Sequence, residues 1–138
     1  MNYLLDTNVI SETVCDKPKA IVMNWLSSIS PDNLYLSVLV TGEIRKGVEQ
    51  LKICPRRKHI EHWLEHELPV YFRNRILDVT QAIGDCWGKL LGAKKSSVPA
   101  IDSLLAATAI HHNLCLVTRN TKDFQYPNLE IFNPWDAH

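Results

Sequence analysis

Short apolar runs alternate along this chain with longer segments in which apolar residues recur at helical spacing. Positions 3–5, 34–37 and 114–117 carry mostly continuous apolar residues, as strands buried on both faces of a parallel sheet do. Residues 75–79 are weakly strand-like, and residues 129–132 predict the last strand. Strands that alternate with helices indicate an α/β sandwich with a mainly parallel sheet.

The predicted helices depend on apolar stripes and on the positions of proline. They cover residues 8–13, 18–29, 38–51, 55–69, 82–91 and 99–110. Because proline is favoured at the first position of a helix, Pro18 and Pro99 are expected to open two of them. Pro55 and Pro69 are expected to bracket a third. The helix at 99–110 is apolar almost all round, which predicts a central, buried position.

The length and charge of the chain limit its class. Its 138 residues predict a single domain, residues 1–138, because domains of this size bury a sizeable core. A content of 46% hydrophobic and 22% charged residues is ordinary for a globular protein. The formal net charge is zero, so a nucleic-acid substrate would have to be held by a local basic patch.

Membrane and secreted classes are not expected. Asp6 interrupts the first apolar stretch too early for a signal peptide, and no run approaches the roughly 18 apolar residues of a membrane span. The cysteines are scattered, without a Cys-x-x-Cys pair, at Cys15, Cys54, Cys86 and Cys115. We therefore expect a cytoplasmic protein with reduced, mostly buried thiols.

Four acidic residues differ from their apolar surroundings. Asp6 follows the first strand and Asp123 follows the strand at 114–117. Glu43 and Asp102 lie on helical segments that are otherwise apolar. Because ligands bind beyond the carboxyl ends of parallel strands, the four carboxylates are candidates for one shared site.

Each acid taken alone also fits a structural role. Asp6 can cap the helix that follows it, and Asp102 can favour the helix dipole from the first turn of its helix. Glu43 can pair with Lys46 three residues on, and Asp123 can form an Asx turn. On local grounds these roles compete evenly with a functional one.

Taken together, the four acids favour a metal site. Unit charges about 4 Å apart repel by roughly 4 kcal/mol at an effective dielectric of about 20, so acids that meet must protonate or recruit a cation. Oxygen ligands without cysteine or histidine favour Mg²⁺ or Mn²⁺ over zinc. Such an ion can polarise a phosphoryl oxygen and activate a water molecule, which indicates phosphodiester hydrolysis.

Four segments that contain these acids resemble, in order, the motifs of PIN-domain nucleases of the VapC/FitB toxin type. They are LLDTNVIS at 4–11, SVLVTGEIRKG at 37–47, DSLLAATA at 102–109 and VTRNTKDF at 117–124. Asn133-Pro134-Trp135 near the end is also typical of that family. The resemblance implies a three-layer α/β/α PIN-like fold and an Mg²⁺- or Mn²⁺-dependent endoribonuclease that acts as the toxin of a type II toxin–antitoxin pair.

The resemblance also implies roles for individual residues and partners. Asp6 and Asp102 would be the principal metal ligands, and Glu43 and Asp123 would complete the acidic pocket. The polar residues that would fix the loops and orient the carboxylates are Asn8, Thr118 and Asn120. Toxins of this type are usually homodimers, each held by a small antitoxin protein, so both partners are expected here alongside the RNA substrate.

Basic residues near these motifs are candidates for RNA contacts. Arg119 lies between the strand at 114–117 and the loop that carries Asp123. Arg45 and Lys46 begin the main basic cluster of the sequence, which continues to residue 58. The cluster is either a phosphate track that leads RNA towards the acids or an ordinary solvated surface.

Two other functions compete with the nuclease. His62-Trp63-Leu64-Glu65-His66 matches the H-x-x-E-H pattern of inverted zinc peptidases, although both histidines fall on the polar side of an amphipathic helix. Alternatively, the chain is a catalytically inert PIN-like module that only binds an antitoxin-like protein or DNA. Retention of four mutually repelling acids favours the enzyme over the module.

Overall fold

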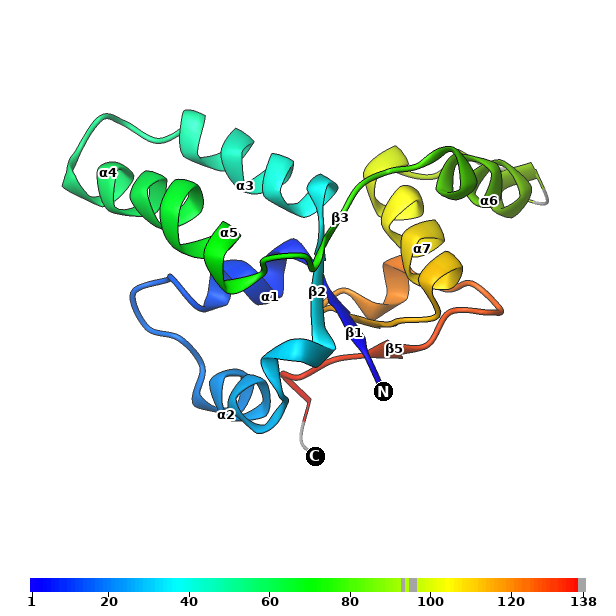
Figure 1. Cartoon of the computed structure of the whole chain (residues 1–138), viewed down its shortest axis with the longest axis horizontal. Helices are drawn as coiled ribbons and strands as arrows, with labels where there is room; N and C mark the ends of the chain where they lie inside the picture. Colours follow the sequence, from blue (N-terminus) through cyan, green and yellow to red (C-terminus); the bar gives the residue numbers. More distant parts are fainter. Residues whose placement is uncertain (93, 95–96, 137–138) are drawn as a thin grey trace.

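The computed structural model describes residues 1–92, 94 and 97–136, and its sheet confirms the predicted fold class (Figure 1). Within these residues five strands form one sheet in the order β3-β2-β1-β4-β5, and all neighbouring strands are parallel. Two strands have their predicted bounds and three are shorter. They are β1 (Tyr3–Leu5), β2 (Leu34–Ser37), β3 (Ile76–Leu77), β4 (Cys115–Val117) and β5 (Ile131–Phe132).

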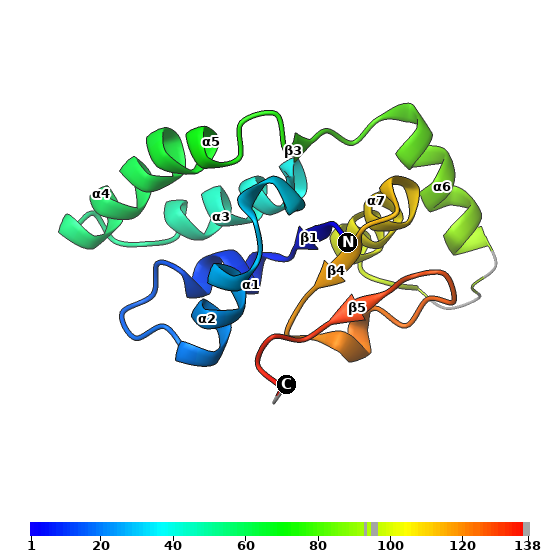
Figure 2. The same cartoon turned by 60° about the horizontal axis from the view of Figure 1, so that its bottom comes forward.

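Helices flank the sheet. Figures 1 and 2 show α3, α4 and α5 together on one side of the molecule and α6 beside α7 on the other. The α-helices are α1 (Thr7–Glu12), α2 (Ala20–Ser28), α3 (Val38–Glu49), α4 (Pro55–His62), α5 (Leu68–Tyr71), α6 (Gln81–Gly92) and α7 (Ala100–His112). A π-helical turn, Trp63–Glu67, joins α4 to α5, and two 3-10 turns cover Pro31–Asn33 and Thr121–Asp123.

Two predictions about proline need correction, and the first concerns Pro18. The helix α2 begins at Ala20, two residues later than predicted, with Lys19 in extended backbone geometry at its N-cap. The carboxylate of Glu12 accepts a hydrogen bond of 2.7 Å from the backbone N–H of Lys19. This contact fixes the connection between α1 and α2, so the chain enters the helix only after it.

The second correction concerns Pro69, which was expected to end its helix. The helical run instead continues through α4, the π-turn and α5 to Tyr71. The backbone N–H of Leu68 bonds to the carbonyl of Trp63, five residues back. Pro69 therefore stands in the first turn of the renewed α-helix, where its missing N–H costs little.

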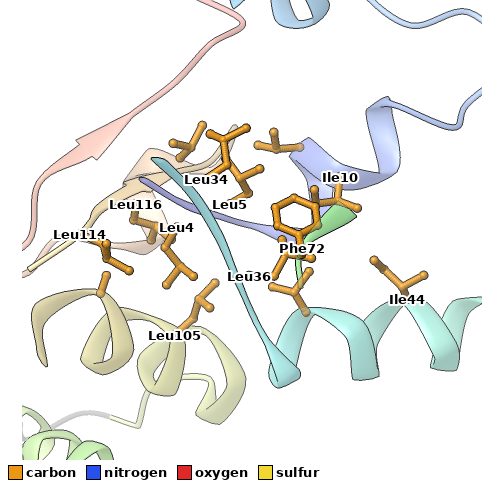
Figure 3. Packing of buried hydrophobic residues seen from close by; sticks show 14 of the residues in the cluster. Leu4, Leu5, Ile10, Leu34, Leu36, Ile44, Phe72, Leu105, Leu114 and Leu116 are labelled. Carbon is orange, nitrogen blue, oxygen red and sulfur yellow. The ribbon is translucent and has the colours of Figure 1, made fainter. Parts of the chain in front are cut away.

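The core lies on both faces of the sheet because successive side chains of a strand point to opposite sides. Figure 3 shows Leu4 and Leu116 on the side that faces Leu105 of α7, whereas Leu5 and Leu34 project from the other side. Leu4 and Leu116 are fully buried. The predicted central position of α7 is confirmed, since its residues 105–109 are all buried.

The alignment of β1 with its neighbours brings three strand ends to one edge of the sheet. Tyr3 pairs with Leu34 of β2 and with Cys115 of β4. The three strands are parallel, so the residues that follow them emerge at the same edge. Asp6 is the first residue beyond β1, and its backbone N–H donates to the carbonyl of Val117 at 2.9 Å.

The cysteine prediction is confirmed in part. All four cysteines are free thiols, but Cys115 alone is buried and the other three are half-buried. Among the described helices, none combines the length and the hydropathy that a membrane crossing requires.

Candidate active site

Asp6 is the most buried of the four acids, and the residue is only 6% exposed. One carboxylate oxygen, Oδ1, accepts a hydrogen bond of 2.7 Å from the backbone N–H of Thr7. The other, Oδ2, accepts one of 2.8 Å from the hydroxyl of Thr118. Asp6 is also the N-cap of α1. The structural role predicted for it is therefore present, and the same carboxylate that caps the helix is the candidate metal ligand.

Glu43 is tied to the first acidic motif by Thr7. The Thr7 hydroxyl donates a hydrogen bond of 2.6 Å to Oε1 of Glu43, across 36 residues of sequence. Thr7 therefore contacts Asp6 through its backbone and Glu43 through its side chain. No role was predicted for Thr7, because nothing local in the sequence marks a partner so far along the chain.

Asp102 and Asp123 approach from the β4 side of the site. Asp102 lies in the first turn of α7 and is half-buried. Its carboxylate accepts no hydrogen bond from any residue that the structure describes. Asp123 is exposed, in the 3-10 turn Thr121–Asp123 that follows β4.

The four carboxylates share one electrostatic environment. Burial raises the pKa of Asp6 above its usual 3.8, and the charges of Glu43 and Asp123 raise it further against the hydrogen bonds that lower it. Burial also raises the pKa of Asp102, with added contributions from Asp6, Glu43 and Asp123. The fold therefore holds these acids within range of one another at a cost that a bound cation would offset.

The described side chains do not converge fully. Over residues 1–92, 94 and 97–136, no three side chains of histidine, cysteine, aspartate or glutamate lie close enough to hold an ion as they stand. The chemistry of the donors nevertheless fits Mg²⁺ or Mn²⁺, because all four groups offer carboxylate oxygen. Asp6 supplies a buried carboxylate and Asp102 one without a hydrogen-bond partner among the described residues.

The three predicted supporting residues meet at the hydroxyl of Thr118. That hydroxyl accepts a hydrogen bond of 3.4 Å from the side-chain amide of Asn8 and one of 3.1 Å from the backbone N–H of Asn120. The Asn8 amide also lies 3.5 Å from Oδ2 of Asp6. Asn120 thus contributes its backbone to the network, and Asn8 and Thr118 contribute side chains.

The three candidate RNA contacts differ in availability. Arg119 is exposed, with its guanidinium over the ring of Trp135 at 5.2 Å from the centroid. Lys46 is exposed on α3. Arg45 forms ion pairs on the protein surface, where it donates to Glu65 at 2.8 Å and pairs with Glu49 at 3.6 Å, so RNA would have to displace two carboxylates to contact it.

The zinc-peptidase pattern gains no support from the structure. The rings of His62 and His66 lie side by side, with centroids 4.8 Å apart, and both residues are exposed. No third metal ligand stands with them in the described part of the chain.

Two cavities lie near α1 on different sides. The larger, of about 400 Å³, is lined mainly by apolar side chains of α1, α2 and α5 and contains none of the four acids. The smaller, of about 350 Å³, lies between α1, α3 and α4 and includes Thr7 and Glu43 in its lining.

Comparisons with known proteins agree on one family. The family model described as PIN domain matches residues 3–127. The toxin FitB of Neisseria gonorrhoeae is 33% identical over 135 residues, which cover 96% of this chain and 97% of that protein. The VapC ribonuclease Y4jK of Sinorhizobium fredii is 32% identical over 136 residues, with 96% and 97% covered.

A solved structure extends the likeness to the whole fold. The structure of FitAB bound to an IR36 DNA fragment contains a chain that matches this one with a TM-score of 0.90 and 30% identity. The match covers 99% of this chain and 97% of that one.

Proposed function

The chain belongs to the PIN domain family, and on this premise we propose that it is a metal-dependent endoribonuclease that acts as the toxin of a type II toxin–antitoxin pair. The observation that carries the proposal is the buried Asp6 carboxylate within electrostatic range of Glu43 and Asp123, with Asp102 coupled to all three. A module that only bound a partner would gain nothing from so unfavourable a cluster. The names of similar proteins, a VapC ribonuclease and a toxin, support the same function.

In this proposal Asp6 and Asp102 hold the ion, which is Mg²⁺ or Mn²⁺. When bound, the ion supplies a Lewis acid that polarises the phosphoryl oxygen and lowers the pKa of a water molecule. Thr118 and Asn8 fix the orientation of the Asp6 carboxylate through the bonds described above. Loss of such an outer contact typically lowers metal affinity or activity by about 10- to 100-fold.

In this proposal Glu43 and Asp123 orient the attacking water molecule. Thr7 occupies Oε1 of Glu43, which leaves Oε2 to accept a proton from the water as its oxygen attacks phosphorus. The bond between phosphorus and the leaving ribose oxygen then breaks, and a proton passes to that oxygen. Because water is the nucleophile, the 2′-hydroxyl of the RNA is not consumed.

The partners follow from the same family membership. We propose that residues 1–138 form a single PIN domain. We also propose that the chain forms a homodimer and that a small antitoxin neutralises it. The similar chain in the FitAB structure belongs to an assembly bound to DNA. Arg119 and Lys46 are the proposed phosphate contacts for the RNA substrate.

The test is cleavage of single-stranded RNA by the purified chain with EDTA, Mg²⁺ or Mn²⁺. We expect cleavage with either metal, none in EDTA, and none by Asp6→Asn. Asp78→Asn is the matched control, because Asp78 is an exposed carboxylate outside the site. Failure of the wild-type chain to cut RNA with any divalent metal, while it still binds an antitoxin, would favour the inert binding module.

A further inference from the structure

The cavity of about 350 Å³ contains one of the four acids, Glu43, in its lining. Most of the lining is apolar, and the remaining residues include Thr7, Ser11, Arg56 and Trp63. Gly47 of α3 leaves one wall without a side chain. The cavity therefore brings together an acid of the candidate active site, an aromatic residue and a cationic residue.

This combination suits an unpaired nucleobase. Proteins that recognise single-stranded RNA stack splayed-out bases on aromatic rings or on arginine, and read their edges with polar groups. The volume lies at the small end of the range of about 300–1,000 Å³ found for small-molecule sites. A single base fits a space of this size.

We propose that this cavity binds one unpaired base of the RNA substrate, from a nucleotide adjacent to the scissile phosphodiester. The inference rests on the proposed ribonuclease function. Because Glu43 belongs to both the acidic site and the cavity, a nucleotide whose phosphate lies at the acids reaches the cavity with its own base. The cavity would then contribute to the choice of cleavage site.

Arg56 is available for this role although it forms an ion pair. Its partner Asp16 has a side chain that is 84% exposed, and the side chain of Arg56 is itself 49% exposed. Exposed pairs of this kind contribute little to stability, so RNA can displace Asp16 at small cost. The guanidinium is then free to contact a substrate in the cavity whose lining also contains Glu43.

Gly47 provides a steric probe that leaves the catalytic groups in place. A Cβ atom at this position would meet no other group within 4 Å, so Gly47→Leu extends into the cavity without a clash at its base. The substitution also favours the helix, since leucine is a better helix former than glycine. Gly88→Leu on α6 is the matched control, because a Cβ there also meets nothing within 4 Å and Gly88 lies outside the cavity.

The experiment compares these variants on a single-stranded RNA whose wild-type cleavage point has been mapped, and on the same RNA with an abasic ribose on either side of that point. For the wild-type chain, we expect one abasic position to raise KM about 10-fold, the order of one lost base stack. Gly47→Leu should show the raised KM on the intact RNA with kcat nearly unchanged, and should lose nothing further on the abasic RNA. Gly88→Leu should behave as wild type.

Four results would overturn the cavity assignment. Two are kinetic: a wild-type KM for Gly47→Leu on the intact RNA, and an effect of Gly47→Leu that multiplies with the effect of the abasic ribose. Loss of antitoxin neutralisation with unchanged RNA kinetics would assign the cavity to a protein. Binding of the intact RNA is measured in parallel by fluorescence anisotropy in EDTA, where Gly47→Leu should weaken binding. If the wild-type chain binds the RNA but does not cleave it, only the ribonuclease proposal is contradicted. Equal binding by Gly47→Leu and wild type would contradict the base-binding role of the cavity.

Discussion

The hydroxyl of Thr7 lies 2.6 Å from Oε1 of Glu43 and joins the first residue of α1 to the middle of α3. The backbone N–H of the same residue holds Asp6. One threonine therefore sets the separation of two carboxylates that repel each other. Its side chain controls the direction of Glu43, and its backbone contributes to the cap of α1.

We expect Thr7→Val to lower cleavage about 10- to 100-fold, the usual effect of losing a group that orients an active-site carboxylate. The cap of α1 should survive, because the backbone N–H remains. Thr7→Ser keeps the hydroxyl and should restore most of the activity. The measurement is kcat and the Mg²⁺ concentration for half-maximal rate. Equal activity of Thr7→Val and Thr7→Ser would show that the hydroxyl has no positioning role.

Arg119 and Arg45 should respond differently to removal of the guanidinium. Arg119→Ala should raise KM for RNA and lower the slope of log affinity against log salt concentration by about 0.7, the value for one phosphate contact on a single strand. Arg45→Ala should raise KM less than Arg119→Ala, because RNA would have to displace two carboxylates, Glu65 and Glu49, from Arg45. A salt slope that falls for Arg45→Ala and not for Arg119→Ala would reverse this assignment.

The strands and the edge of the sheet that carries the acids could be predicted from the sequence because their signals are local. The apolar runs that end at Leu5 and Val117 mark strands, and acids that follow such runs gather at one edge of a parallel sheet. The parallel direction of the strands was predicted because the apolar runs alternate with helices along the chain. Whether these acids bind metal remains a prediction.

Other features could not be predicted because their causes are distant in sequence or depend on context. The bond from Thr7 to Glu43 spans 36 residues, and the pairing of Arg45 with Glu65 depends on how α3 packs against the π-turn. Pro69 read as a helix end because the widened turn before it, which makes its missing N–H harmless, leaves no mark in the sequence.

The raised pKa of Asp6 predicts the direction of the pH dependence of stability without metal. The folded chain retains protons that the unfolded chain has released above pH 3.8, the ordinary pKa of aspartate. The free energy of unfolding therefore falls as pH rises from about 3.8 through the raised pKa. Asp6→Asn should remove this contribution and should be more stable than wild type at pH 7 in EDTA.

Thermal unfolding of wild type and Asp6→Asn in EDTA across this pH range checks the sign. A gain of a few degrees in Tm at pH 7 is expected, because each kcal/mol is worth roughly 2–8 °C in domains of about this size. Asp78→Asn serves as the control, since that carboxylate is exposed. A lower Tm for Asp6→Asn at pH 7 would mean that its hydrogen bonds outweigh the cost of its buried charge.

Addition of Mg²⁺ or Mn²⁺ should invert that order of stability. An ion that binds the folded chain at 100 times its Kd adds about 2.7 kcal/mol to the free energy of unfolding, and this gain requires the Asp6 and Asp102 carboxylates. Wild type should therefore gain Tm with metal and overtake Asp6→Asn and Asp102→Asn, which should gain little. Because protons compete for the same oxygens, the gain should shrink as pH falls towards the raised pKa values of Asp6 and Asp102. Equal stabilisation of wild type and both variants by the metal would place the ion elsewhere and remove the structural basis for a shared metal centre.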